Sequence, residues 1–309
     1  MNRSPQPAAS TLTLPSAATA APVAARWRTV LSVFKLRISV LIMATALGGM
    51  FIVPAASVAP LQGLMLALSV LLASASAGAF NQFIEADSDR LMARTRQRAF
   101  ASGTLPRSGA WLLGIAALLV FAVTLAVWFV NLAAAGFVLA GALTYAGVYT
   151  LGLKRRTPWN IVVGGLAGSF AVLAGAAAVN PQVGALGLLL ALVLFLWTPP
   201  HFWSLAIANE AQYAAAGVPM LPVVVGAARA ARIVHASTIA LVAVSLLPVF
   251  FGAGWTVFAG AAVGGVHFLR KTHALARQPG RQTAMAAFFA SMVQLSALLA
   301  AVVIDAALR

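Results

Sequence analysis

AWLLGIAALLVFAVTLAVWFV (residues 110–130) and LAAAGFVLAGALTYAGVYTLGL (residues 132–153) are two long apolar runs that Asn131 alone separates. Each run has the length that an α-helix needs to cross the hydrocarbon core of a bilayer, roughly 20 residues. In lipid such a run becomes a helix, because a helix satisfies its backbone hydrogen bonds internally. The pair therefore predicts two antiparallel membrane helices.

The composition of the whole chain agrees with this reading. Of 309 residues, 62% are hydrophobic and only 8% are charged, which leaves too little polar surface to cover a soluble protein. The absence of cysteine excludes disulfides, thiolate metal sites and cysteine nucleophiles. The net charge of +15 does not indicate nucleic-acid binding, because the basic residues form short clusters between apolar spans, where they meet lipid headgroups.

Apolar runs divide the chain into about nine spans, so the expected fold is an all-α polytopic membrane bundle. Residues 1–28, rich in Ala, Pro, Ser and Thr, are expected to be a disordered tail. Residues 29–309 are expected to form one membrane domain with no separate soluble part. The predicted spans are 33–53, 61–80, 110–130, 132–153, 159–179, 184–207, 233–252, 254–269 and 284–305.

The distribution of Lys and Arg predicts the orientation of this bundle. Of the 20 basic residues, all except Arg309 lie in the N-terminal segment up to the start of the first span, where Lys35 and Arg37 stand, or in the connections after the second, fourth, sixth and eighth spans. By the positive-inside rule these parts are cytoplasmic, which places the N-terminus inside and the C-terminus outside. The expected location is the bacterial cytoplasmic (inner) membrane, with the mitochondrial inner membrane as the alternative.

Carboxylates are scarce, and three of the five in the chain fall within residues 85–89. Asn81, Glu85 and Asp89 are four residues apart, so on a helix that continues out of the second span they form one stripe. Two carboxylates at this spacing repel one another unless a cation lies between them. Mg²⁺, which binds one or two carboxylates and completes its shell with water and phosphate oxygens, fits this pattern.

Basic residues follow the acidic stripe at once. The spacing of Arg94 and Arg98 favours these two arginines as partners of the stripe. A second basic cluster, which includes Lys154 and Arg155, follows the fourth span and is expected on the same face of the membrane. Carboxylates, Mg²⁺ and guanidinium groups together are typical of a diphosphate site.

The segment TPPHFW (residues 198–203) is the most unusual part of the sixth span. Pro199 and Pro200 are expected to break the helix and to release backbone carbonyl groups. A histidine in an apolar span indicates a functional site by default, so His201 is a candidate. A histidine that only satisfies a hydrogen bond in the core is the alternative.

Four motifs resemble the protohaem IX farnesyltransferase (haem O synthase) family of the UbiA-type intramembrane prenyltransferases. They are NQFIEADSDRLMARTRQR (81–98), YTLGLKRRTPWNIVVGG (149–165), TPPHFW (198–203) and AGVPMLPV (216–223). The resemblance covers residues 30–305. It implies that farnesyl diphosphate, haem b and water are converted to haem O and diphosphate for haem–copper oxidase biogenesis, with a haem A synthase or an oxidase assembly factor as the expected recipient.

The resemblance also assigns roles to individual residues. It implies that Asn81, Glu85 and Asp89 are the catalytic Mg²⁺ ligands. The basic residues of the site bind diphosphate, and His201 contacts haem. The diphosphate-binding set is Arg94, Arg98, Lys154 and Arg155.

This chain departs from the family pattern near Tyr213. The family generally has acids just before this tyrosine, whereas Ala211 and Gln212 stand here, with Glu210 the nearest acid. Glu210 and Tyr213 are therefore a candidate second cluster, and the number of Mg²⁺ ions, one or two, stays open. Two alternative functions remain at this point. One is prenylation of another aromatic acceptor, such as a quinone precursor, and the other is membrane transport.

Overall fold

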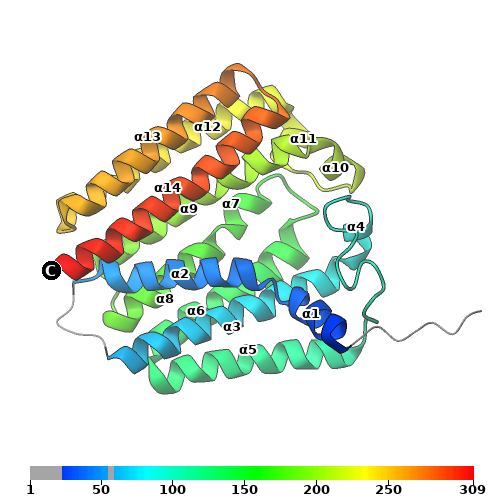
Figure 1. The fold of residues 1–309 in the computed structure, drawn as a ribbon, viewed down its shortest axis with the longest axis horizontal. Coiled ribbons are helices and arrows are strands. Elements are labelled where there is room, and N and C mark those ends of the chain that lie inside the picture. Colours follow the sequence, from blue (N-terminus) through cyan, green and yellow to red (C-terminus); the bar gives the residue numbers. More distant parts are fainter. Residues whose placement is uncertain (1–22, 55–58) are drawn as a thin grey trace, which may run out of the picture.

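A computed structural model describes residues 23–54 and 59–309, and within these ranges the chain forms helices and loops without any strand (Figure 1). Most of the expected tail, residues 1–22, lies outside the described residues, and helix α1 begins at Val23. Seven helical segments are long and apolar enough to cross a membrane. They are α3 (Pro60–Ile84), α5 (Gly109–Phe129), α6 with the π-helix η1 (Leu132–Leu143, Thr144–Leu153), α7 with α8 (Asn160–Gly164, Leu166–Val179), α9 (Ala185–Ala208), α12 with the 3₁₀-helix η2 (Ala227–Ser245, Leu247–Phe251), and α14 (Arg281–Leu308).

Two further segments have lengths suited to a membrane but differ from the seven. Helices α1 (Val23–Val33) and α2 (Leu36–Ile52) bend by 46° at a short break and count as an eighth span if the pair is taken as one. Helix α13 (Trp255–Arg277) corresponds to the eighth predicted span, but it extends beyond the apolar run to include several basic residues. The structure therefore supports a polytopic helical membrane protein, with seven or eight spans by length and composition.

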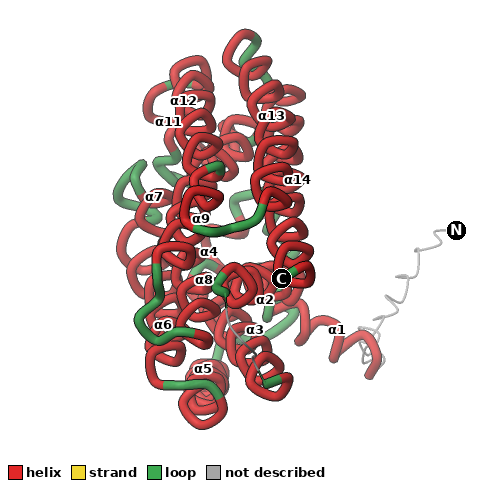
Figure 2. Tube along the Cα trace, turned by 90° about the vertical axis from the view of Figure 1, so that its left-hand side faces the viewer, coloured by secondary structure: helices red, strands yellow, loops and turns green. Residues whose placement is uncertain are grey.

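The helices are arranged in a closed circuit, as the view along the bundle shows (Figure 2). From α2, each helix packs on the next in the order α3, α5, α6, α8, α9, α12, α13 and α14, and α14 returns to α2. Contacts between α2 and α8 and between α9 and α14 cross the interior of the circuit. This arrangement packs α14, the last helix, against α2, near the start of the described chain.

Small residues allow the closest approaches between these helices. A Cβ atom on Gly49 of α2 would lie 2.1 Å from the carbonyl oxygen of Val172 in α8, and one on Gly175 would lie 1.7 Å from that of Ala46. The backbones of α2 and α8 therefore touch, as is typical of membrane helix pairs that use small residues.

Hydrogen bonds inside the bundle add to this packing. Ser69 and Ser76 of α3 donate to backbone carbonyls of α5 at 2.7 Å, and Ser169 of α8 donates to the carbonyl of Ala191 in α9 at 2.9 Å. Near the C-terminal end of α14, Asp305 accepts a hydrogen bond from the backbone N–H of Gly254, which directly precedes α13. These bonds connect neighbouring helices of the bundle.

The expected break at Pro199 and Pro200 is not observed, because α9 runs from Ala185 to Ala208 with both prolines inside it. Side-chain hydroxyl groups add hydrogen bonds to two backbone carbonyls in the proline-containing part of the helix. Thr198 Oγ1 donates to Leu194 O at 2.9 Å, and Ser204 Oγ donates to Pro200 O at 2.7 Å. Packing against α8, α12 and α14 keeps the helix continuous although two backbone donors are missing.

Short helices gather at one end of the bundle. These are α4 (Ala86–Arg90), α10 (Glu210–Ala215) and α11 (Leu221–Val225), and the junction of α1 with α2 lies at the same end (Figure 1). The α1–α2 junction, the connection that contains α4 and the connection that contains α10 and α11 therefore lie at one mouth of the bundle.

Candidate active site

The three residues of the predicted acidic stripe lie at the end of α3 and in α4. Asn81, Glu85 and Asp89 are each buried, with exposed fractions of 2%, 1% and 0%. The helix is interrupted for one residue at Glu85, but the backbone keeps its helical hydrogen bonds, from Glu85 N to Asn81 O at 3.0 Å and from Asp89 N to Glu85 O at 2.8 Å. The predicted stripe is therefore present and faces the protein interior.

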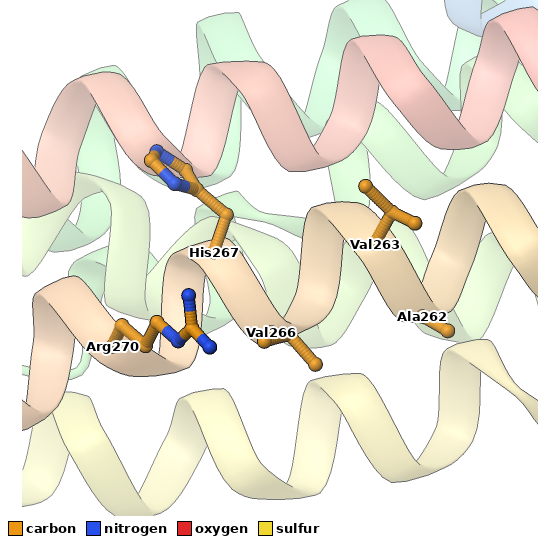
Figure 3. A pocket seen from close by; sticks show the side chains of 5 residues that line it. All are labelled: Ala262, Val263, Val266, His267 and Arg270. Atoms are coloured by element: carbon orange, nitrogen blue, oxygen red, sulfur yellow. The ribbon is translucent and has the colours of Figure 1, made fainter.

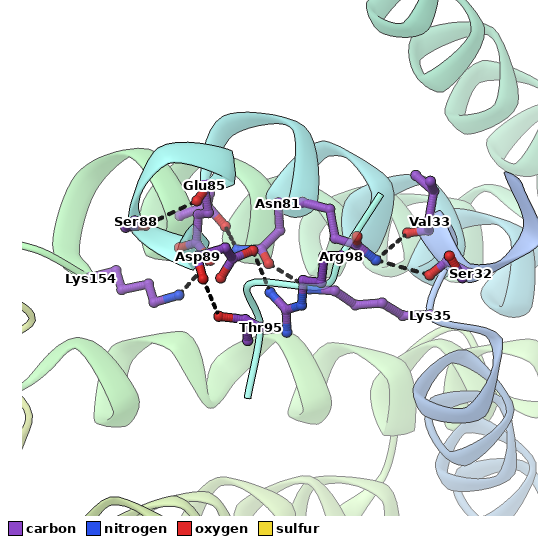
Figure 4. A network of polar contacts seen from close by, with 12 residues as sticks. Ser32, Val33, Lys35, Asn81, Glu85, Ser88, Asp89, Thr95, Arg98 and Lys154 are labelled. Atoms are coloured by element: carbon purple, nitrogen blue, oxygen red, sulfur yellow. Dashed lines mark hydrogen bonds and ion pairs between the residues drawn. The ribbon is translucent and has the colours of Figure 1, made fainter. Parts of the chain in front are cut away.

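Cationic side chains from three different segments converge on this stripe (Figure 4). Lys154 Nζ donates to Glu85 Oε2 at 2.5 Å, and Arg98 Nη1 donates to Asp89 Oδ2 at 2.7 Å. A third cation, Lys35, donates to Asn81 Oδ1 at 2.5 Å. The structure thus brings the acids, Arg98 and Lys154 together as the sequence predicted.

Each carboxylate of the stripe has one oxygen without a hydrogen-bond partner among the described residues. These atoms are Glu85 Oε1 and Asp89 Oδ1, and both are buried. A buried carboxylate oxygen without a partner is unfavourable. Two such oxygens beside the Asn81 amide oxygen make a donor set that suits a hard divalent cation. The described residues contain no cluster of three His, Cys, Asp or Glu side chains that could hold a metal, and here the third donor would be an amide.

The π-helix η1 positions the cations and hydroxyls opposite the stripe. Its wider turns are visible in the hydrogen bond from Lys154 N to Tyr149 O at 3.0 Å, which spans five residues. Thr150 Oγ1, on the same element, accepts a hydrogen bond from Asn81 Nδ2 at 3.1 Å. Beyond η1, Arg155 Nη2 donates to Ser88 Oγ at 2.9 Å.

The turn that follows α4 holds the two predicted arginines differently. Thr95 Oγ1 donates to the carbonyl oxygen of Asp89 at 3.0 Å, which folds the turn back over the stripe. Arg98 reaches Asp89 from this turn. Arg94 is exposed, and the described residues show no ion pair between it and the stripe.

Several residues of the site were not among the sequence candidates. Lys35, which contacts Asn81, is the most prominent of them. It was missed because the basic residues near the N-terminus predict membrane orientation and did not single it out. Thr150 and Ser88 are small polar residues without a distinctive pattern. Asn160 is fully buried, donates to Thr157 O at 2.6 Å, and leaves its Oδ1 atom without a partner. An asparagine in an otherwise apolar span was the one available signal for it.

His201 lies in a pocket of aromatic rings between α9 and α14. Its ring stacks on Trp197 at 4.1 Å and on Phe288 at 4.5 Å between centroids, and its Nδ1 atom lies 2.6 Å from Ser291 Oγ. Both faces and one nitrogen of the ring are thus occupied. No hydrogen bond joins His201 to the acidic stripe within the described part of the chain.

The candidate second cluster occupies α10, at the same mouth. Tyr213 is buried at 7% exposure, whereas Glu210 is half-buried and has no ion pair among the described residues. Next to them, Gln212 Nε2 donates to Asn209 Oδ1 at 3.3 Å. Of the two expected acidic positions, Ala211 and Gln212, only Gln212 is polar, and it forms a neutral amide pair with Asn209.

An open groove of about 430 Å³ lies apart from these sites, on the outer face of α13 (Figure 3). A single helix supplies its lining, which consists of Ala262, Val263, Val266, His267 and Arg270. This surface groove contains none of the candidate residues.

Comparisons with known proteins identify the family and the fold. The profile of the UbiA prenyltransferase family matches residues 42–293. The chain is 55% identical to protoheme IX farnesyltransferase 2 of Paramagnetospirillum magneticum over 89% of this chain and 95% of the relative. It is 40% identical to protoheme IX farnesyltransferase of Marinobacter nauticus, over 90% and 92% of the two chains.

Two solved structures share the fold. A structure of digeranylgeranylglyceryl phosphate synthase superposes with a TM-score of 0.75 at 18% identity, covering 91% of this chain and 99% of that one. A UbiA homologue from Archaeoglobus fulgidus bound to DMAPP and Mg²⁺ superposes with a TM-score of 0.66 at 13% identity, covering 87% and 98%. At these identities the likeness shows the fold alone.

Proposed function

The chain belongs to the UbiA prenyltransferase family, and we propose that it transfers the farnesyl group of farnesyl diphosphate to a vinyl group of haem b, with hydration, to give haem O and diphosphate. The observation that carries this proposal is the 55% identity, over nearly the whole of both chains, to a protoheme IX farnesyltransferase. The buried stripe of Asn81, Glu85 and Asp89 supports the same reaction, because it supplies oxygen ligands and paired cations to a diphosphate.

The bond that breaks joins C1 of the farnesyl group to the diphosphate oxygen, and the electron pair leaves with the diphosphate. The vinyl group supplies the electrons for the new carbon–carbon bond, and water adds the hydroxyl group and releases a proton. The family and the donor set both point to Mg²⁺, which would be held by Asn81, Glu85 and Asp89 and would supply Lewis-acid stabilisation to the leaving oxygens.

The cationic residues of this chain further stabilise the negative charge that develops on the leaving diphosphate. Arg98 and Lys154 are fixed in place by Asp89 and Glu85, so their donors are oriented before substrate binds. Such preorganised charge stabilises the developing charge on the leaving group without reorganisation during the reaction. We assign Arg155 to the same role and Arg94, which is exposed, to the capture of the incoming diphosphate.

We place haem against His201. Because Trp197 and Phe288 cover both faces of the imidazole and Ser291 occupies Nδ1, haem can reach His201 only through the Nε2 edge. This edge would act as an iron ligand or as a hydrogen-bond partner. Glu210 and Tyr213 are our candidates for a second, weaker cation site, in which one carboxylate replaces the acidic pair.

We further propose nine spans, counting α1 with α2 as one and α13 as another. Helix α13 has the length of a span and packs against α12 and α14, two helices that qualify by composition. The positive-inside distribution then places the mouth with the active site in the cytoplasm and the C-terminus outside. The named relatives are bacterial, which favours the bacterial cytoplasmic membrane, with a haem A synthase or an oxidase assembly factor as the recipient of haem O.

The test is to incubate membranes that contain the protein with haem b, farnesyl diphosphate and Mg²⁺, and to measure haem O by mass spectrometry. Haem O should form only when all three are present. Parallel reactions replace haem b with a quinone precursor such as 4-hydroxybenzoate. Prenylation of that acceptor without haem O would contradict the proposal, and so would the absence of any prenylated product. The relatives favour neither the quinone acceptor nor a transport function.

A further inference from the structure

Lys35 lies at the break between α1 and α2, in a left-handed backbone conformation with φ of 48° and ψ of 43°. Residues with a Cβ atom rarely adopt this conformation, and where they do the surroundings hold them there. Here Gln82 Nε2 donates to the carbonyls of Ser32 and Val33, at 2.9 Å and 3.1 Å. The junction is therefore fastened to α3 at the residue beside Asn81.

The three cations that contact the stripe differ in whether they have a carboxylate partner. Lys154 pairs with Glu85 and Arg98 pairs with Asp89, so each of these cations has a carboxylate partner. Among the described residues, Lys35 has none. The three cations that contact the stripe therefore exceed its two carboxylates by one.

The contacts of Lys35 are with neutral groups. Its ammonium donates to Asn81 Oδ1, and it lies 5.9 Å from the centre of the Tyr145 ring. Because an ammonium carries three donor protons, a single amide acceptor leaves donors available. A partly buried cation without a counterion is unfavourable, which indicates that an anion completes this site when the protein binds its substrate.

We propose that Lys35 binds the diphosphate of the prenyl donor directly and supplies the charge that Mg²⁺ and the paired cations leave uncompensated. This inference rests on the proposed function for the identity of the anion. The left-handed conformation of the junction then serves this binding, because it directs the Lys35 side chain toward the stripe. No other site residue comes from α1 or α2 among the described residues. A role limited to orienting the Asn81 amide is the alternative.

Four variants separate these two roles. Lys35→Met removes the charge and the donor, whereas Lys35→Gln removes the charge and keeps a donor for Asn81. Lys35→Arg keeps the charge. Arg37→Gln removes an equal charge from an exposed position two residues away and serves as the matched control.

The first measurement is the affinity of each purified, detergent-solubilised protein for inorganic diphosphate with Mg²⁺, by isothermal titration calorimetry. We expect Lys35→Met and Lys35→Gln to bind about tenfold more weakly or worse, as for the loss of one charge-assisted hydrogen bond. Lys35→Arg should recover most of the affinity, and Arg37→Gln should match the unmodified protein. In turnover, the KM for farnesyl diphosphate should rise while the KM for haem b stays unchanged.

Wild-type affinity in Lys35→Gln would overturn the proposal, since it would show that Lys35 only orients Asn81. Circular dichroism checks folding, and if Lys35→Met does not fold, the comparison of Lys35→Gln with Lys35→Arg decides the matter. The binding assay contains no haem, so it is independent of the proposed reaction. Lys35-dependent diphosphate binding without haem O formation would refute the reaction alone, whereas haem O formation with Lys35-independent binding would refute this inference alone.

Discussion

Replacing Asp89 with asparagine tests the active-site assignment most directly, because the change preserves the shape of the side chain and removes only its charge. Asp89 is fully buried, with Oδ2 2.7 Å from Arg98 Nη1 and Oδ1 without a partner among the described residues. In Asp89→Asn, the guanidinium loses its carboxylate and the metal site loses an anionic ligand. Both losses act on the charge that develops on the leaving diphosphate.

The expected loss can be estimated from these contacts. Removing one preorganised electrostatic partner from an active site lowers kcat by about 10²–10³. The effect on folding should be smaller, about 1–2 kcal/mol, because the Arg98 side chain is 25% exposed and can turn toward water. We therefore expect a folded protein that forms haem O at least about a hundredfold more slowly.

The assay is haem O formation from haem b, farnesyl diphosphate and Mg²⁺, followed by mass spectrometry, with circular dichroism to confirm folding. Asp87→Asn is the matched control, because Asp87 lies two residues away, is 67% exposed, and pairs only with Arg90 and Arg107 within the described residues. It should retain activity within about twofold, as is typical of exposed ion pairs. Near-normal turnover in Asp89→Asn, or an equal loss in Asp87→Asn, would refute the reasoning.

Three further predictions follow from the structure. His201→Ala should weaken haem b binding, measured by absorbance titration, while His235→Ala should not; equal affinities for both variants would make His201 structural. Removal of divalent ions with EDTA should abolish haem O formation and leave the helical circular dichroism signal unchanged, and Mg²⁺ should restore activity; activity that persists in EDTA would contradict the metal site. The chain has no cysteine, so single cysteines can be placed at Gln182 and Gln278, which are both exposed. A membrane-impermeant maleimide should label the cysteine at 182 from the outside and the cysteine at 278 from the cytoplasmic side. Labelling of both from one side would contradict the proposed orientation.

The positions of the helices were predictable because hydrophobic length determines where a chain crosses lipid. The predicted run 132–153 coincides with the segment formed by α6 and η1. The eighth predicted span, 254–269, covers only the apolar part of α13, which continues to Arg277. Hydrophobicity marks the lipid-embedded part of a helix and carries no information on how far the helix extends beyond it.

The acidic stripe was predictable from the four-residue spacing, since that spacing aligns side chains on any helix. The position of Lys35 beside Asn81 was not predictable, because it depends on a left-handed residue and on the Gln82 contacts with Ser32 and Val33, neither of which has a pattern in the sequence. The predicted break of α9 at Pro199 and Pro200 was wrong. The tendency of proline to break a helix was outweighed here by packing against three neighbouring helices.

The π-helical turns of η1 have a consequence for how this segment tolerates changes in its length. Lys154 directly follows Thr144–Leu153, whose turns are wider than those of an α-helix, and this winding sets the direction from which Lys154 reaches Glu85. Deleting one residue from 144–153 would allow the ordinary winding to return and would rotate Lys154 away from its partner. We therefore expect that shortening or lengthening this segment by one residue disrupts the site more than substitutions at its exposed positions do.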